Sequence, residues 1–400
     1  MSEKILVAQS GGPTAAINAT LSGVIGGALE AGAEIYGAEN GIKGVMEDWT
    51  VHLNPVFEHA ENRALLRTTP SSYLGSCRYK LPEGEDAVYR DIFEKLDRDG
   101  ITRFLYIGGN DSMDTVGKLS SYAKKHGIGI SIVGVPKTID NDLVGTDHTP
   151  GFGSAAKYVA ATVREIARDS AVYAERSVTV VEIMGRNAGW LTAASSLARC
   201  STSLAPHLIY LPERPVSAEK ILSDIEHCPA RNMIVAVSEG VKNEKGEYFC
   251  AEEAGAHDIF GHAQLAGASR VIAGLVKNRF HYKTRGIELN IPQRCGAHFA
   301  SETDLFESER IGRAGVLAAL AGKTGISMGF ERTCEYQVKI VENDVLEVAN
   351  KERRLPDAYI HPDANDVTDA FLTYARPLIL GEPQLMMEDG LPKHIALRKF

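Results

Sequence analysis

The chain has 400 residues, of which 44% are hydrophobic and 24% charged, and its formal net charge at pH 7 is −9. These values are typical of a globular protein of about two to three domains, which can bury a stable core without disulfides. The acidic balance, without a basic run, argues against nucleic acid as a main partner. No apolar stretch approaches the roughly 20 residues that span a bilayer. The first residues, MSEKILV, lack the architecture of a signal peptide, so we expect a cytoplasmic protein with no membrane partner.

The cysteines and histidines give no sign of a metal site. No CxxC pair occurs, and no Cys/His spacing is typical of zinc. The 12 histidines include no HExxH motif, which argues against a metallohydrolase. The six cysteines are expected to be reduced thiols of a cytosolic enzyme: Cys77, Cys200, Cys228, Cys250, Cys295 and Cys334.

Strand-like and helix-like segments alternate along most of the sequence. Short apolar runs separated by segments of helix length predict an α/β fold, with parallel strands and helices on both faces of the sheet. Such sheets bind ligands at the carboxyl ends of their strands. In chain order we expect a strand at Lys4–Ala8, a helix at Ala15–Leu29, a strand at Arg103–Ile107, a helix at Ser112–Lys125, a strand at Gly129–Val135, a helix at Ser154–Arg168, a strand at Val178–Ile183, a helix at Asn187–Ala198, strands at Ile234–Val237 and Gly286–Leu289, and helices at Ala263–Lys277 and Leu305–Ala321.

The last stretch of the sequence, from about Glu335 onward, differs in composition. Gln337–Ile340 and Asp344–Val348 could form a hairpin around Glu342 and Asn343. The remainder is rich in proline and charge, and its pattern predicts no further element. We find no internal repeat and no low-complexity linker in the chain.

The first expected strand runs into the sequence AQSGGPTAAINATLSG. Gly11, Gly12 and Pro13 predict a tight turn, and a helix is expected to open at about Thr14. Glycines let a backbone approach an anion closely, and the free N–H groups at a helix start point toward it. The stretch fits a phosphate cradle and an ordinary strand-to-helix turn equally well.

The next expected strand ends in YIGGNDSMDT. Gly108 and Gly109 again permit a close approach, and Asn110, Asp111 or Ser112 could cap the following helix. A cap explains one oxygen side chain, but not two glycines and two further oxygen side chains at one strand end. Mg²⁺ prefers one or two protein oxygens together with phosphate oxygens, so Asp111 or Asn110 is a candidate ligand.

The third strand end reads GVPKTIDND, with Lys137, Thr138, Asp140 and Asp142 in close succession. Three strand ends therefore carry glycines, a cation and carboxylates. Phosphoryl transfer needs this set, because donor phosphates require fixed N–H groups, a lysine and a metal, while the acceptor hydroxyl requires a carboxylate base.

Two nucleotide-binding motifs are absent. The GKT at Gly322–Thr324 resembles the end of a P-loop, but that motif needs a glycine where Leu317 stands, and it follows a helix-like run rather than a strand. No GxGxxG occurs near the first strand, which weakens the case for a dinucleotide oxidoreductase, although this alternative stays open.

Over about residues 4–325 the sequence resembles the phosphofructokinase family. The resemblance implies two lobes, each a mainly parallel sheet with helices on both faces, and an active site between them. Residues 1–142 and 284–334 would form a larger, donor-binding lobe, residues 143–283 a smaller lobe for the sugar phosphate, and residues 335–400 a C-terminal extension. The resemblance rests on motifs in the family's order: SGGPTAAIN, LGSCR (Leu74–Arg78), GGNDS, PKTIDND, VEIMGR (Val181–Arg186), SEG (Ser238–Gly240) and IPQR (Ile291–Arg294).

The resemblance also implies roles for individual residues. Asp140 would accept the proton of the sugar's 1-hydroxyl, with Lys137 and Asp142 beside it in the catalytic set. Arg285 and Arg294 would grip the 6-phosphate, since paired arginines can hold a phosphate bidentately. The other residues of the sugar-phosphate site would be Thr138, Ile139, Met184, Gly185, Arg186, Glu239 and Ile291.

The family also implies a homo-oligomer, a dimer or a tetramer. In the family a neighbouring subunit supplies one arginine of the phosphate grip. Here the aligned position is Ser177, with Arg176 next to it, so the sequence departs from the family's pattern at that contact.

The donor site would contain Gly11, Gly12, Arg78, Gly109, Asn110, Asp111 and Lys137. ATP-using relatives typically have a glycine in place of Asp111 and a small residue in place of Lys137, so this pair resembles the pyrophosphate-dependent branch. An aspartate fills the space of ATP's α-phosphate and repels it, while a lysine supplies charge to a compact pyrophosphate. That branch often reads GGDDS, whereas Asn110 stands first here. Either Asp111 holds the Mg²⁺, or the pyrophosphate mainly does.

The resemblance therefore implies reversible phosphoryl transfer from pyrophosphate to the 1-hydroxyl of fructose 6-phosphate, a reaction of glycolysis and gluconeogenesis, with Mg²⁺ as cofactor. The products would be fructose 1,6-bisphosphate and phosphate. An ATP-dependent enzyme of the same fold is the main alternative. A non-catalytic regulatory relative is a more distant one, because Asp140, Arg186 and Arg294 are intact.

Overall fold

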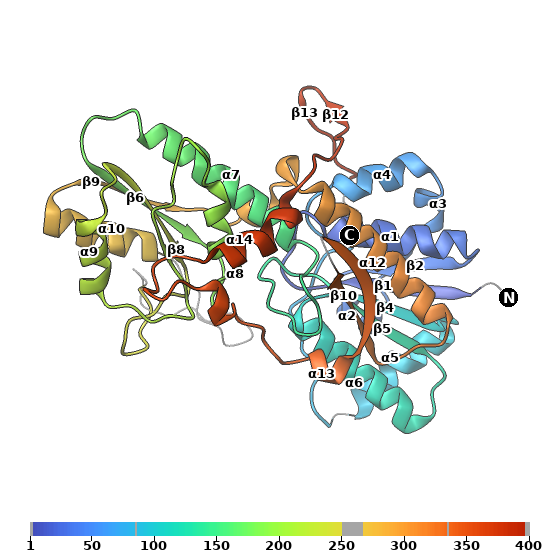
Figure 1. Cartoon of the computed structure of the whole chain (residues 1–400). Helices are drawn as coiled ribbons and strands as arrows, with labels where there is room; N and C mark the ends of the chain where they lie inside the picture. The colour runs from blue at the N-terminus through green and yellow to red at the C-terminus, as the bar shows by residue number, and fades with distance from the viewer. Residues whose placement is uncertain (1–2, 85, 250–266, 334–335, 397–400) are drawn as a thin grey trace.

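Two sheets, each in its own lobe, organise the molecule. The computed structural model describes residues 3–84, 86–249, 267–333 and 336–396. Figure 1 shows the lobe with the larger sheet on the right and the lobe with the smaller sheet on the left. The predicted α/β architecture, with mainly parallel strands and helices on both faces, is confirmed.

The larger sheet has seven strands in the order β11-β10-β5-β4-β1-β2-β3. The strands from β10 to β2 run parallel, and the edge strands β11 and β3 pair antiparallel with their neighbours. The bounds of these strands are β1 Lys4–Gln9, β2 Glu34–Ala38, β3 Thr50–His52, β4 Arg103–Gly108, β5 Ser131–Pro136, β10 Ile326–Thr333 and β11 Gln337–Asp344.

Side-chain alternation along β1 gives the larger sheet its two buried faces. Ile5 and Val7 pack toward helices α1 (Ile17–Glu30) and α12 (Glu302–Leu320). Leu6 and Ala8 point the other way, into a cluster with residues of α5 (Asp86–Arg98) and α6 (Asn110–His126). This is the period of two expected of a strand that is covered on both faces.

Helices α1 and α12 approach each other closely because glycines face the contact. A Cβ atom at Gly23 would lie 2.0 Å from the carbonyl oxygen of Glu309, and one at Gly312 would lie 2.2 Å from that of Thr20. This packing fixes the start of α1, which follows the glycine turn after β1.

The smaller sheet has four parallel strands in the order β7-β8-β6-β9. One of its faces packs with α7 and α8, and the other with α9 and α10. The bounds are β6 Ser177–Ile183, β7 Leu208–Tyr210, β8 Asn232–Ser238, β9 Lys283–Glu288, α7 Phe152–Ser170, α8 Trp190–Ala194, α9 Ala218–His227 and α10 Ala268–Phe280.

The C-terminal extension runs from the larger lobe to the smaller one and back. Helix α13 (Val345–Val348) packs on α6, whereas Phe371 and Tyr374 of α14 (Asp369–Ala375) lie in the core of the smaller lobe. Figure 1 shows α14 between the lobes and the β12–β13 hairpin projecting beyond it. The remaining elements are α2 Ile42–Met46, α3 Asn54–Phe57, α4 Ala60–Thr68, η1 Ser195–Ala198, α11 Pro292–Cys295, η2 Ala297–Phe299, η3 Asp357–Tyr359, η4 Arg376–Ile379, β12 Met387–Glu388 and β13 Leu391–Pro392.

The predicted hairpin in the extension is wrong. Gln337–Asp344 is one continuous strand that pairs antiparallel with β10, and residues 345–348 form the helix α13. The side chain of Asp344 explains the change of structure, because its Oδ1 accepts a hydrogen bond of 2.9 Å from the Leu346 N–H and caps the helix.

Other expected elements shift at their ends. The helix expected at Asn187–Ala198 begins only at Trp190 and finishes as a 3-10 turn, and the strand expected at Gly286–Leu289 begins at Lys283. The helix expected at Ala263–Lys277 corresponds to α10, which begins at Ala268. Residues 263–266 of the expected helix lie outside the described residues.

The predicted lobe boundaries need two adjustments. Strand β9 belongs to the smaller sheet, although residues 284–288 were expected in the larger lobe, and β11 of the extension belongs to the larger sheet. Pairing rather than sequence position decides both memberships.

Of the cysteines, Cys77, Cys200, Cys228 and Cys295 are free thiols, while Cys250 and Cys334 lie outside the described residues. Within the described part of the chain, no helix combines the length and apolar character needed to cross a membrane.

Candidate active site

A cleft of about 600 Å³ is lined by residues of both lobes and of the extension. It lies at the carboxyl ends of β1, β4 and β5 in the larger sheet and of β6 and β8 in the smaller sheet, where ligands of parallel sheets bind. Most of the residues predicted from the sequence line it: Gly11, Gly12, Arg78, Gly109, Asn110, Asp111, Lys137, Thr138, Ile139, Asp140, Asp142, Met184, Arg186, Glu239 and Arg294.

The glycine turn after β1 closes around Lys137. The Lys137 Nζ donates a 2.6 Å hydrogen bond to the carbonyl oxygen of Gly12. Gly11 has a φ of +80°, and a Cβ atom there would lie 3.1 Å from the Lys137 Nζ. Thr14 does not begin the helix as expected. Its Oγ1 instead accepts from the N–H of Ile17 at 2.9 Å, and α1 begins at that residue. The turn thus holds a cation at the floor of the cleft.

The two glycines of the second pair differ in what the surrounding protein requires of them. A Cβ atom at Gly108 would lie 2.0 Å from the Ser112 Oγ, so this glycine is required by the packing of the following helix. Gly109 has an extended backbone with φ −88°, and its nearest neighbour, the Lys137 carbonyl oxygen, would lie at an ordinary 3.6 Å from a Cβ. Packing thus accounts for Gly108, while the close approach of a ligand at these two positions stays a prediction.

The start of α6 carries unpaired oxygen. The helix begins at Asn110 without a side-chain cap, so the capping role expected for Asn110, Asp111 or Ser112 is wrong. The Asn110 Nδ2 donates to the carbonyl oxygen of Lys351 at 2.8 Å, which leaves the Asn110 Oδ1 buried without a partner in the described structure. Asp111 has a half-exposed side chain, 3.8 Å from the Lys80 Nζ.

These oxygens are suited to a magnesium ion that a phosphate ligand also holds. The described residues contain no group of three or more His, Cys, Asp or Glu side chains that could hold a metal alone. Mg²⁺ commonly takes one or two protein oxygens and completes its coordination with phosphate and water. The orphaned Asn110 Oδ1 and the Asp111 carboxylate meet that need.

Charged groups at the floor of the cleft perturb one another. Lys137 is only 2% exposed, and this burial lowers the pKa of its ammonium to about 8, although Asp140 opposes the shift. Burial likewise raises the pKa of Asp140, against the opposing effect of Lys137. Burial and the charge of Asp140 raise the pKa of Asp142 and of Glu239 to about 7 each. Such shifted groups are characteristic of proton-transfer sites.

In the smaller lobe, Gly185 shapes the turn after β6. Its φ is +128°, and a Cβ atom there would lie 2.6 Å from the Ala188 carbonyl oxygen. The Gly185 N–H donates to the Glu239 Oε1 at 3.3 Å, which orients that carboxylate toward the cleft. Gly185 itself does not line the cleft, and its contribution is made through Glu239.

Two arginines of the cleft carry unused donors. The Nε atoms of Arg186 and Arg294 are buried and find no acceptor within the described residues. A buried guanidinium donor without a partner is costly, so a bound anion would satisfy both. Gln293, which the sequence interpretation missed, fixes the neighbouring backbone, because its Oε1 accepts from the Met184 N–H at 3.1 Å.

Arg285 and Ile291 do not join this cluster within one chain. Arg285 lies on the edge strand β9, has a half-exposed side chain, and pairs with Asp169 at 3.5 Å. Ile291 precedes α11 and is 53% exposed, and neither residue lines the cleft. The expected joint grip of Arg285 and Arg294 is therefore not formed in the single chain, because the Arg285 side chain lies against Asp169 of α7 and outside the cleft that Arg294 lines. A role for Arg285 and Ile291 in the sugar-phosphate site stays a prediction.

The extension supplies cleft residues that the sequence did not predict. Asn350 and Glu352 line the cleft, and the Asn350 Nδ2 donates to the Asp114 Oδ1 at 2.8 Å. The charged run that contains them resembles any solvated segment, so its composition carries no signal of a site.

Comparisons with known proteins agree with this geometry. A family model described as Phosphofructokinase matches residues 4–319. A pyrophosphate–fructose 6-phosphate 1-phosphotransferase of Xanthomonas campestris pv. campestris is 42% identical, over 98% of this chain and 96% of the relative. A sulfofructose kinase of Alkalicoccus urumqiensis is 31% identical, over 89% of this chain and 92% of the relative. The crystal structure of a pyrophosphate-dependent phosphofructokinase from Nitrosospira multiformis superimposes with a TM-score of 0.90 at 34% identity, over 99% of this chain and 96% of that one.

Proposed function

Because the chain belongs to the phosphofructokinase family, we propose that it transfers a phosphoryl group from pyrophosphate to the 1-hydroxyl of fructose 6-phosphate. The observation that carries this proposal is the buried Lys137 between the Gly11–Gly12 turn and Asp140, with Asp111 at the start of α6 in the same cleft. This set matches a short, highly charged donor that has no nucleoside to anchor it.

In the proposed mechanism Asp140 accepts the proton of the sugar's 1-hydroxyl as that oxygen attacks the nearer phosphorus. Burial raises the pKa of Asp140 above its ordinary value, which makes the carboxylate a stronger base. The new O–P bond forms as the bridging P–O bond of pyrophosphate breaks, and phosphate leaves. The Lys137 ammonium stabilises charge on the transferring group, with Asp142 beside it.

The sugar phosphate occupies the other side of the cleft. Arg186 and Arg294 bind its phosphate through their Nε donors, which find no acceptor among the described residues. Glu239 accepts hydrogen bonds from sugar hydroxyls, and Thr138 and Ile139 line the site beside the base. Arg285 and Ile291 belong to this site only if a neighbouring subunit completes it.

On the donor side, the Gly11–Gly12 turn, Gly109 and Arg78 surround the pyrophosphate. Asn110 and Asp111 would hold Mg²⁺ together with the pyrophosphate, and the ion would neutralise phosphate charge. We further propose that residues 1–142 and 284–334, apart from β9, carry the donor side, that residues 143–283 carry the sugar side, and that the protein is a cytoplasmic homo-oligomer.

A coupled assay with Mg²⁺ and fructose 6-phosphate tests the proposal. The expected result is turnover with pyrophosphate and little or none with ATP, together with the reverse reaction from fructose 1,6-bisphosphate and phosphate. A preference for ATP would replace the donor assignment with the ATP-dependent alternative. Sulfofructose belongs in the same assay as a second acceptor, because one relative is named a sulfofructose kinase. Turnover of sulfofructose alone would overturn the acceptor assignment.

A further inference from the structure

The C-terminal extension passes directly beside the loop that carries Asp140. We call residues 138–149 the base loop. Glu352 forms an isolated antiparallel bridge with Leu143, and the Arg353 N–H donates to the Asp142 carbonyl oxygen at 2.6 Å. The extension is thus joined to the base loop through the main chain, two residues beyond the proposed base.

The side chain of Arg353 binds the base loop a second time. Its Nη2 donates to the carbonyl oxygen of Asn141 at 2.9 Å. Its Nη1 donates to the carbonyl oxygens of Thr146 at 2.7 Å and Asp147 at 2.6 Å. One planar guanidinium therefore ties together the two ends of the base loop, a geometry that a lysine ammonium cannot reproduce.

Arg353 is itself held by the smaller lobe. Its guanidinium lies over the ring of Trp190, 4.4 Å from the centroid, and the Trp190 Nε1 donates to the Arg353 carbonyl oxygen at 3.0 Å. Trp190 is 2% exposed in the core of that lobe. The position of Arg353 is consequently fixed before any ligand binds.

The base loop needs such support because Asn141 has a φ of +54°. Asparagine adopts this left-handed conformation more readily than most residues with a side chain, but the conformation still costs free energy, which the surrounding contacts offset. The Asn141 side chain contributes, since its Nδ2 donates to the Tyr374 hydroxyl at 2.9 Å and its Oδ1 accepts from the Thr149 N–H at 3.0 Å. Asn141 stands between Asp140 and Asp142, so its backbone conformation determines where both carboxylates point.

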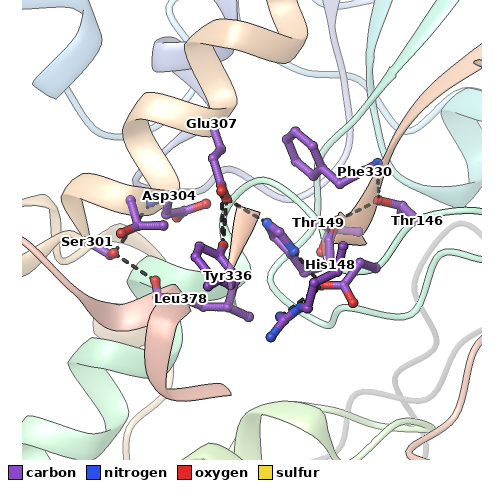
Figure 2. Close-up of polar contacts among 12 residues, drawn as sticks. Thr146, His148, Thr149, Ser301, Asp304, Glu307, Phe330, Tyr336 and Leu378 are labelled. Carbon is purple, nitrogen blue, oxygen red and sulfur yellow. Dashed lines mark hydrogen bonds and ion pairs between the residues drawn. The ribbon is translucent and has the colours of Figure 1, made fainter. Parts of the chain in front are cut away.

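The far end of the base loop is anchored to the larger lobe. Figure 2 shows His148 reaching Glu307 of α12, with its Nε2 2.7 Å from the Glu307 Oε2, while the Tyr336 hydroxyl donates to the same carboxylate. The Thr146 Oγ1 accepts from the Phe330 N–H at 2.9 Å. With this end fixed, the stretch around Asn141 depends on the extension.

We propose that Arg353 is a positioning residue for the proposed base, and that the C-terminal extension is thereby part of the active site. This inference rests on the proposed function for the role of Asp140, but the order of the base loop does not depend on it. Arg353 contacts no reacting atom. It acts by holding the Asn141 carbonyl and, through it, the direction of Asp140.

The test compares Arg353→Ala and Arg353→Lys with the control Arg354→Ala. The Arg354 side chain is 68% exposed, and its ion pair with the Glu352 carboxylate is long at 4.0 Å. A misplaced catalytic group can lower a rate by about 100-fold. We expect Arg353→Ala to lose about that much kcat, with each KM changed by less than about 3-fold. Arg353→Lys should lie between, and millimolar guanidinium should restore part of the Arg353→Ala rate but leave the control unchanged.

Hydrogen–deuterium exchange of the full-length chain without substrate gives a second readout that needs no turnover. Backbone amides of residues 138–149 should exchange faster in Arg353→Ala than in the wild type. In Arg354→Ala they should exchange as in the wild type. If wild type turns over neither pyrophosphate nor ATP, the proposed function fails while exchange still tests the loop. Should Arg353→Ala not fold, Arg353→Lys serves in both measurements. Wild-type exchange in a folded Arg353 variant, or a loss of activity that lies entirely in KM, would overturn the inference.

Discussion

The base loop and the start of α6 face the same cleft, yet they are held in opposite ways. The base loop is fixed by Arg353, Tyr374 and its own threonines, so that the backbone around Asp140 is in place without a ligand. At the start of α6 the Asn110 Oδ1 has no partner in the described structure, and Asp111 is half-exposed. In the proposed mechanism, the protein thus supplies the geometry of proton transfer itself, while it leaves polar atoms on the donor side for a ligand to satisfy.

The largest effect is expected where the fixed region carries the chemistry. Asp140→Asn keeps the size of the side chain but removes the proton acceptor, so kcat should fall by about 10²–10⁴-fold. Steady-state kinetics with thermal unfolding as a control would measure this. Near-normal kcat in a folded variant with normal substrate affinity would show that another group is the base.

A smaller effect is expected at the arginines that are proposed to bind the sugar phosphate. Arg294→Ala removes a charged hydrogen bond worth about 1.5–3 kcal/mol, which corresponds to a rise of roughly 10–150-fold in the KM for fructose 6-phosphate. The KM for the donor must be measured beside it, because Arg294 also lies close to the donor side. Its Nη1 would be 3.6 Å from a Cβ atom at Gly12. A larger rise in the donor KM would move Arg294 to the donor side.

The pH dependence should reveal the buried lysine. Because burial lowers the pKa of Lys137 to about 8, its charge is lost as pH rises through that value, and kcat/KM for the donor should then fall by up to about tenfold per pH unit. On the acid side, Asp140 must be ionised and burial raises its pKa, so activity falls as pH drops. A bound anion stabilises the ammonium, which moves the alkaline limb of kcat to higher pH. A flat alkaline limb of kcat/KM between pH 7 and 9.5 would contradict the role of Lys137.

The smallest effect is expected on the loosely held donor side. Exposed charge interactions contribute about 0.2–1 kcal/mol, so Asp111→Asn should raise the half-saturating Mg²⁺ concentration by only about 1.5–5-fold. Glu94→Gln, an exposed carboxylate of α5 outside the cleft, is the matched control. An effect at Asp111 no larger than at Glu94 would leave Asn110 and the pyrophosphate as the holders of the ion.

The strand ends of the larger sheet could be predicted because local signals agree there. Around Lys137, a run of β-branched residues ends in charged ones, and the structure brings these residues into one cleft. Gly11, in the turn after β1, was also predicted, and its φ of +80° and the Lys137 Nζ 3.1 Å from a Cβ position both disfavour a side chain there.

The role of the extension could not be predicted from the sequence. Arg353 binds carbonyl oxygens, which every residue has, so neither its partners nor its position leaves a pattern in the side chains. The same reason applies to Gln337–Asp344, whose partner strand is chosen by the edge that β10 leaves open. Arg285 lies on β9 and pairs with Asp169 of α7, outside the cleft of its own chain, and this neighbour on another element leaves no local signal in the sequence.

The stacking of Arg353 on Trp190 gives the base loop an optical reporter. The chain has two tryptophans, and Trp49 is 46% exposed whereas Trp190 is buried beneath the guanidinium. A buried indole emits at shorter wavelength than a hydrated one, so the two contributions differ in colour. In a Trp49→Phe background the single remaining emitter sits against the residue that holds the base loop. Stopped-flow fluorescence of that variant would then time any movement of the loop against the chemical step, without an added label.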